Sequence, residues 1–255
     1  MRMLLAAALL LAAAPPLPVA RAAARDVSDR QTQVVTLSAA KALAIDITIG
    51  AVRIEGADRP DAEIVVERRA PAREGLARVP LAIEDTPSRV SVRALQTNHT
   101  TDPAYRADVT VRVPRAAVIE RVRVMEGRID VAGLSGKLTA DIRRGPINGT
   151  DLSGTLRLEA GIGSVTLNNT RLSEDGLLRL RAFNGDVKLT LAERPTDARI
   201  MALAVNGQVR SDIPLTRRNT WGPRWGETTL GKGAPVISLD VVTGVVELKS
   251  PNRTP

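Results

Sequence analysis

The sequence contains no cysteine, one histidine and four aromatic residues among 255 residues. Without cysteine, the chain can form no disulfide framework and no lipid-linked cysteine. Zinc sites are built mainly from Cys and His, so these counts argue against a zinc site. His99, in "QTNHTTDP", would have to serve any Ser-His-Asp triad, but no nucleophile elbow is present. We interpret His99 as a solvated loop residue and expect no metal and no cofactor.

The scarcity of aromatic residues also restricts the core. Phe and Tyr occur once each and Trp twice, so Val, Ile, Leu and Ala must fill the interior. Such side chains favour a narrow interior. No second hydrophobic segment follows residue 25, and a membrane-spanning helix needs about 20 apolar residues. We therefore expect no transmembrane segment in the mature chain.

The first 24 residues have the layout of a secretory signal peptide. A basic start at Arg2 precedes an apolar run over 3–14, and prolines end that run. Ala20-Arg21-Ala22 and Ala22-Ala23-Ala24 both offer an A-x-A cleavage site. The sequence thus predicts export, to the periplasm or to the cell surface and extracellular space.

The charge balance is basic. The chain has 36 Lys and Arg against 28 Asp and Glu, and removal of Arg2 and Arg21 with the signal peptide leaves 34 against 28. No run of five like charges occurs, so the excess is spread over the surface. Because export makes nucleic acid an improbable partner, the expected partners are envelope polysaccharide, anionic lipid or another envelope protein.

Glycine recurs every nine residues in "GKLTADIRRGPINGTDLSGTLRLEAGIGSV", at positions 136, 145, 154 and 163. Cutting at every second glycine gives units of 18, 18, 22 and 22 residues, namely 127–144, 145–162, 163–184 and 185–206. Such a unit cannot bury its own apolar face, but stacked copies can. The glycines would then mark corners with positive φ or close backbone approach.

Apolar residues alternate with polar ones after each glycine, as in half-buried strands. Leu156 and Leu158 point inward in this pattern, whereas Arg157 and Glu159 point outward. We predict an all-β fold, a β-solenoid of stacked 18–22-residue two-strand repeats. The Asn-Gly pairs leave an antiparallel meander or sandwich as the alternative. A calcium-binding nonapeptide roll is disfavoured, because paired glycines and an aspartate at a constant offset are missing.

One domain is expected over 25–255. It comprises N-terminal strands (25–113), regular repeats (114–206) and an expanded last turn with C-terminal strands (207–255). No linker divides these parts.

The stretch from "ADVTVRVPRAAVIERVRVMEG" through "SGTLRLEAGIGSVTL", "NGDVKLTL" and "TGVVELK" resembles the bacterial putative-adhesin β-strand-repeat family. The resemblance covers about residues 105–250. It implies an exported β-solenoid of the cell envelope with no established activity. Because the shared motif is a structural repeat, it carries over no catalytic residue.

Two candidate sites follow from the pattern. Residues 18 apart should stack about 4.8 Å apart on successive parallel strands. This aligns Asp141 with Glu159, and paired carboxyls at such a spacing occur in retaining glycosidases. The alternative is a solvated column relieved by Arg143, Arg157 and Arg181.

The second candidate is "NTWGPRWGE" (219–227), which holds Trp221, Arg224 and Trp225. Trp offers a large rigid contact area with a polar N–H, as recognition surfaces require. The other interpretation, which we favour, is a cap over the end of the stack, since terminal repeats need one.

The predicted function is a non-enzymatic binding, adhesion-like or scaffold role in the cell envelope. The alternative is a polysaccharide-active enzyme that uses Asp141 and Glu159.

Overall fold

The computed structural model describes residues 26–38, 41–97, 101–174, 176–218 and 222–251. The predicted signal peptide (1–24), His99 and Trp221 lie outside these ranges. Within them, most residues lie in β-strands, and a short 3-10 helix, η1 (Arg73–Arg78), precedes β4. The N-terminal strands are β1 (Val27–Thr36), β2 (Ala42–Ala57), β3 (Asp61–Ala70), β4 (Leu81–Asp85), β5 (Arg89–Ala94) and β6 (Arg106–Pro114).

The middle strands are β7 (Val118–Ala132), β8 (Lys137–Arg144), β9 (Ile147–Thr150), β10 (Thr155–Ile162), β11 (Val165–Thr170), β12 (Leu177–Asn184) and β13 (Val187–Leu191). The C-terminal strands are β14 (Ala198–Ser211), β15 (Thr216–Arg218), β16 (Arg224–Leu230) and β17 (Val236–Lys249).

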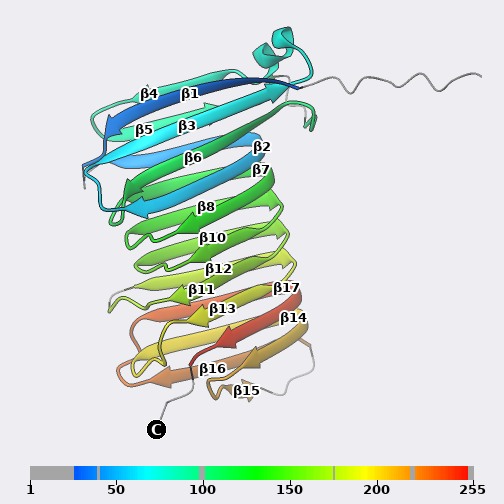
Figure 1. Cartoon of the computed structure of the whole chain (residues 1–255). Helices are drawn as coiled ribbons and strands as arrows, with labels where there is room; N and C mark the ends of the chain where they lie inside the picture. The colour runs from blue at the N-terminus through cyan, green and yellow to red at the C-terminus, as the bar shows by residue number, and fades with distance from the viewer. Residues whose placement is uncertain (1–25, 39–40, 98–100, 175, 219–221, 252–255) are drawn as a thin grey trace, which may run out of the picture.

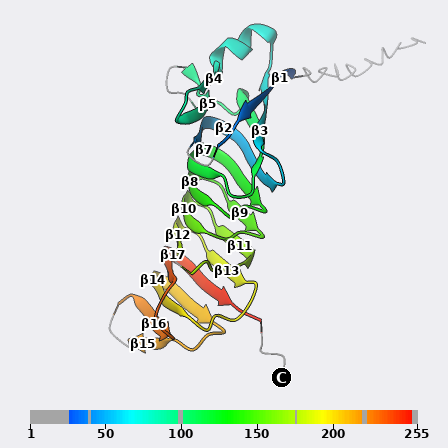
Figure 2. The ribbon, with the colours of Figure 1, turned by 90° about the vertical axis from the view of Figure 1, so that its left-hand side faces the viewer.

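The middle strands form two rows that face each other across the core (Figures 1 and 2). β8, β10 and β12 follow one another in one row, and β9, β11 and β13 follow one another in the other. Side chains alternate as predicted: Leu156 and Leu158 are buried between the rows, and Arg157 and Glu159 are exposed. One cluster of buried aliphatic residues extends from Val35 to Leu248.

The predicted parallel register is confirmed. Glu159 pairs with Asp141, 18 residues earlier, and Arg181 pairs with Glu159, 22 residues earlier. In the other row, Val165 pairs with Ile147 and with Val187. The first three repeats of the sequence, 127–144, 145–162 and 163–184, therefore lie one beside the next at the same position.

Two long strands join the rows. β7 pairs with β8 before Gly127 and with β9 after it. β17 pairs with β12 before Gly244 and with β13 after it. The pairing therefore closes through eight parallel strands: β7, β8, β10, β12, β17, β13, β11 and β9. This closed ring is a parallel β-barrel, elongated along the direction in which the strands stack.

The predicted β-solenoid of stacked two-strand repeats is therefore wrong. The prediction ended a strand at every glycine, but a glycine with φ near +145°, as at Gly127 and Gly244, bends a strand without ending it. It also placed the repeats in chain order, whereas β17 lies between β12 and β14. The alternative antiparallel sandwich is not observed either, because the ring is parallel.

Further strands extend the sheet beyond both ends of the ring. On the N-terminal side, β2 pairs with β7, and β5, β6, β3, β1 and β4 continue outward from it. On the C-terminal side, β14 pairs with β17, and the antiparallel hairpin β15–β16 follows. The division of 25–255 into one domain with three parts stays a prediction.

The recurring glycines have the predicted role. At one corner of the stack they lie one above another, and a Cβ on each would come within about 2 Å of a backbone oxygen on the next strand. Most of them also have φ between 133° and 154°. Only glycine tolerates both conditions at once. The members of this column are Gly50, Gly127, Gly145, Gly163, Gly185, Gly207 and Gly244.

Candidate functional site

The carboxylate pair predicted from the sequence lies on an exposed strand face. Asp141 and Glu159 are neighbours on β8 and β10, and both are exposed. Arg181 Nη1 lies 4.0 Å from Glu159 Oε2. Neither carboxylate lines any of the five hollows described below. The pair therefore lies on an open strand surface, outside the hollows in which a substrate could be held between two carboxyls.

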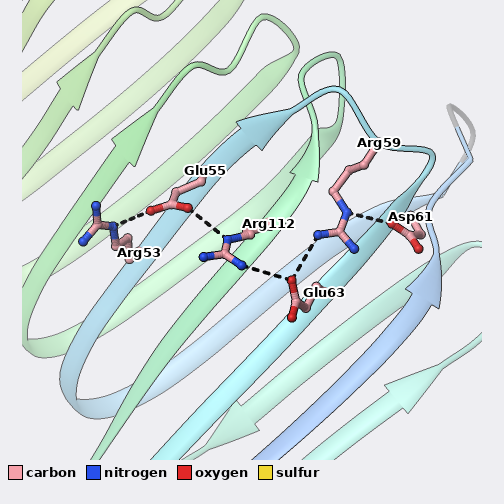
Figure 3. Close-up of polar contacts among 6 residues, drawn as sticks. All are labelled: Arg53, Glu55, Arg59, Asp61, Glu63 and Arg112. Atoms are coloured by element: carbon pink, nitrogen blue, oxygen red, sulfur yellow. Dashed lines mark hydrogen bonds and ion pairs between the residues drawn. The ribbon is translucent and has the colours of Figure 1, made fainter.

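A second cluster of charges crosses β2, β3 and β6 (Figure 3). Arg112 Nε lies 3.2 Å from Glu55 Oε2, and Arg112 Nη1 lies 3.4 Å from Glu63 Oε2. Arg59 Nη1 lies 3.1 Å from Glu63 Oε2 and Arg53 Nε lies 2.7 Å from Glu55 Oε1. Positive and negative groups alternate along this surface and neutralise one another.

This row of alternating charges, here called the ion-pair ladder, continues from Arg59 to Asp61, where Arg59 Nε donates to Asp61 Oδ1 over 2.7 Å. That hydrogen bond raises the pKa of Arg59. Since every cation of the ladder contacts a carboxylate, this face offers no free charge to a ligand. We interpret these ion pairs as contacts that stabilise the pairing of neighbouring strands, with the modest strength expected for surface ion pairs.

Five hollows can be compared by the charges that line them. Four contain both signs: for example, the largest, about 770 Å³, combines arginines with Asp108, Glu126 and Asp130. The hollow beside Glu174, Glu193 and Asp197, about 690 Å³, also contains Arg194 and Lys232. The remaining two mixed hollows place arginines beside glutamates or aspartates. The fifth is different, because it contains no acidic residue.

This fifth hollow, the basic groove, has a volume of about 400 Å³ and lies at the C-terminal end of the stack. Arginines reach it from three strands: Arg210 from β14, Arg217 from β15 and Arg224 from β16. The rest of its lining is Gln208, Val209, Trp225 and Gly226.

Local strand geometry creates the groove. β16 pairs with residues 198–204 of β14 and stops there, while β14 continues to Ser211 along β17. The β15–β16 hairpin is held by Leu215, which packs against Gly226: a Cβ on Gly226 would lie 3.1 Å from Leu215 Cδ1. The groove is the space between the second half of β14 and this hairpin.

The positive charges of the groove arginines are largely not neutralised by carboxylates. Among the described residues, neither Arg217 nor Arg224 forms an ion pair. Arg210 donates to the side chain of Gln208 over 2.9 Å and lies opposite Glu247 of β17. Glu247 is itself bound to Lys249, and this hydrogen bond is the main cause of its lowered pKa.

Trp225 forms the aromatic part of the groove. The residue is partly buried, and its indole Nε1 is inaccessible and has no hydrogen-bond partner. A buried donor without a partner is costly, so this side chain is held by packing rather than by polar contacts.

Of the three predicted binding residues, Arg224 and Trp225 both line the groove, and Trp221 lies outside the described residues. Sequence reasoning missed Arg210 and Arg217. Their proximity depends on the bend of β14 and on the β15–β16 hairpin, which no periodicity in the sequence reveals.

Within the described ranges, no group of three His, Cys, Asp or Glu side chains could hold a metal ion. The helical part of the described chain contains no segment long and apolar enough to cross a membrane.

Comparison with known proteins gives structural neighbours only. No family model matches the chain, and no curated protein matches it. A putative cell adhesion protein from Clostridium sporogenes is 11% identical, over 88% of this chain and 100% of that one, with a TM-score of 0.45. A putative lipid binding protein from Parabacteroides distasonis is 7% identical, over 88% and 95%, with a TM-score of 0.32.

A putative adhesin from Bacteroides fragilis is 10% identical, over 88% of this chain and 97% of that one, with a TM-score of 0.31. These names agree with the family resemblance found in the sequence. At such low identities and TM-scores, the similarity does not indicate what this chain binds. The ligand is therefore inferred from the groove itself.

Proposed function

We propose that this chain is a non-enzymatic binding protein of the bacterial cell envelope and that it holds a polyanionic ligand in the basic groove. One observation carries the proposal. Arg210, Arg217 and Arg224 line a hollow of about 400 Å³ that contains no acidic side chain. The other four hollows each bring acidic side chains together with basic ones.

Arginine suits this task because its planar guanidinium donates two parallel hydrogen bonds to a carboxylate or a phosphate. Three arginines on three strands can contact successive anionic groups of one chain-like ligand. Trp225 adds an apolar surface next to them. Binding of this kind requires neither a nucleophile nor a general base.

The location in the envelope is part of the proposal. It rests on the signal-peptide layout of residues 1–24 and on the family resemblance. The names of the structural neighbours agree with it. The enzymatic alternative has no comparable support, since Asp141 and Glu159 lie on an exposed strand face outside the five hollows.

The proposal is tested by binding of the mature protein to polygalacturonate, polyglutamate and phosphatidylglycerol vesicles. In the test variant, Arg210, Arg217 and Arg224 are all changed to Gln. The matched control changes Arg143, Arg157 and Arg179 to Gln, which removes the same charge from the exposed face of β8, β10 and β12.

The groove variant should bind at least one of these polyanions about tenfold or more weakly, because charge-assisted hydrogen bonds contribute about 1.5–3 kcal/mol each. The control should bind almost as well as the wild type. Added salt should weaken wild-type binding, since screening reduces attraction between exposed charges. Equal losses in both variants, or no binding to any of the three, would refute the proposal.

A further inference from the structure

The second half of β14, residues 206–211, has an open edge. It pairs with residues 243–248 of β17 on one side. On the other side no strand of the described chain pairs with it, because β16 covers only residues 198–204. An uncovered edge presents a row of backbone donors and acceptors that can pair with another chain.

The direction of these backbone groups can be assigned. Asp212 N donates to Leu248 O of β17. Along a parallel strand, consecutive residues direct their N–H and C=O groups to opposite sides. Val209 and Ser211, three residues and one residue before Asp212, therefore direct their N–H and C=O groups away from β17, toward the open edge. Val209 also lines the basic groove.

We infer that the ligand of the groove is an extended, acidic polypeptide segment that pairs with β14 as an additional strand. This inference rests on the proposed function and specifies the partner. Backbone pairing with Val209 and Ser211 would supply affinity, and the arginines would select acidic side chains at alternating positions. Six residues of free edge match the usual length of a strand.

The positive charges of the groove would repel a partner strand that carries basic side chains. Arg210 lies on the open strand itself, and Arg217 and Arg224 lie across the hollow from it. Charged side chains are a common protection of exposed edges against unwanted pairing. Here all three charges are positive. They therefore discourage pairing with basic strands but attract a strand that carries acidic side chains.

The experiment compares three probes on the wild-type mature protein. The first is an eight-residue peptide of alternating Glu and Val with blocked ends. The second is the same peptide N-methylated at alternate residues, prepared in both registers so that one always blocks the paired edge. The third is oligogalacturonate, which is anionic but has no peptide groups.

We expect the first peptide to bind and to protect the amides of Val209 and Ser211 from hydrogen exchange. N-methylation in one register should weaken binding about tenfold or more, because several backbone hydrogen bonds are lost. In the variant with Arg210, Arg217 and Arg224 changed to Gln, binding should also fall about tenfold or more, whereas the control at Arg143, Arg157 and Arg179 should bind normally.

Equal binding of both N-methylated peptides and the parent would overturn strand addition and leave polyanion binding intact. The same conclusion would follow if oligogalacturonate bound at the groove more tightly than the peptide, since the ligand would then be a polysaccharide. Self-association of the protein through β14, blocked by the peptide, would replace the acidic partner with a second copy. Failure of every polyanion to bind would refute the proposed function as well. Because the three probes are compared on the unmodified protein, the test of strand addition does not depend on whether a variant folds.

Discussion

Gly145 lies directly against the backbone of Gly127 on the neighbouring turn of the stack. A Cβ on Gly145 would lie 1.8 Å from the carbonyl oxygen of Gly127, and Gly145 has φ of +133°. Both the steric conflict and the backbone conformation therefore exclude any other residue at this position.

The first prediction concerns this contact. Gly145→Ala should lower the free energy of unfolding by about 3 kcal/mol or more, because the added carbon must push two hydrogen-bonded strands apart. Arg144→Ala, at the adjacent exposed position, should stay within about 1 kcal/mol of the wild type. Urea unfolding followed by circular dichroism would measure both. A Gly145→Ala protein of normal stability would mean that the turns are spaced differently.

A second prediction concerns Asp141 and Glu159, which lie side by side on β8 and β10. Glu159 has Arg181 as an ion-pair partner, whereas no ion pair joins Asp141 to the described residues. Arg123 lies opposite Asp141 on β7 without forming an ion pair with it, so its attraction offsets the repulsion only in part. Asp141→Asn should therefore raise the free energy of unfolding by a few tenths of a kcal/mol, since it removes a like-charge contact between neighbouring strands.

The gain should shrink in high salt, because the repulsion is between exposed charges. Glu159→Gln serves as the comparison: it removes the same repulsion but also the contact with Arg181, so it should stabilise less. Chemical unfolding of both variants at low and high salt would measure these effects. A loss of stability in Asp141→Asn would show that another interaction of this carboxylate outweighs the repulsion.

The third prediction concerns the indole of Trp225. Its Nε1 is buried without a hydrogen-bond partner. Trp225→Phe removes this unsatisfied donor and keeps an aromatic ring, so the free energy of unfolding should change by less than about 1.5 kcal/mol. Trp225→Ala should cost about 2–4 kcal/mol, because the packing of a large, partly buried ring is lost.

Thermal or urea unfolding of the two variants would test this difference. If Trp225→Phe were as destabilising as Trp225→Ala, the indole N–H would have a stabilising partner in solution.

The fourth prediction is a dependence of stability on pH. Arg69 Nε donates to Glu67 Oε1 over 2.8 Å, and this hydrogen bond lowers the pKa of Glu67 from its ordinary value of 4.5. In the unfolded chain the pKa returns to the ordinary value. The ionised form therefore stabilises the fold above that value, and the contribution is lost as the pH falls through the lowered pKa.

Glu67→Gln should accordingly be less stable than the wild type at neutral pH, and the difference should narrow as the pH falls below 4.5. Arg69→Gln removes the same hydrogen bond by deleting its donor. The difference in stability between this variant and the wild type should also narrow as the pH falls. Unfolding measured in urea between neutral pH and about pH 3 covers the relevant range. A constant difference across that range would contradict the assigned pair.

Much of the local structure could be predicted from sequence. The alternation around Leu156 predicted which residues are buried, and the glycine spacing predicted which strands are neighbours, because both patterns follow from strand geometry. The overall arrangement could not be predicted in the same way. The sequence does not distinguish a glycine that bends a strand from a glycine that ends one. The continuity of β7 past Gly127 could therefore not be predicted.

The candidate site was only half predictable. Arg224 and Trp225 stand out because aromatic residues are so rare in this chain. Arg210 and Arg217 are ordinary surface arginines in the sequence, and their role depends on the positions of β14 and β15. The carboxylate pair illustrates the opposite error: stacking brought Asp141 and Glu159 together as predicted, but adjacency on a strand face does not create a substrate-binding cavity.

The position of β17 has a consequence for the order in which the molecule can be assembled. β8, β10 and β12 each join a strand that precedes them in the chain. β14 cannot do so, because its parallel partner is β17, which comes after β14, β15 and β16. In a nascent chain, β14 and the β15–β16 hairpin therefore lack their parallel partner until β17 has been synthesised. The basic groove forms only after that step, so a product truncated before β17 would contain every arginine of the groove and still lack the site.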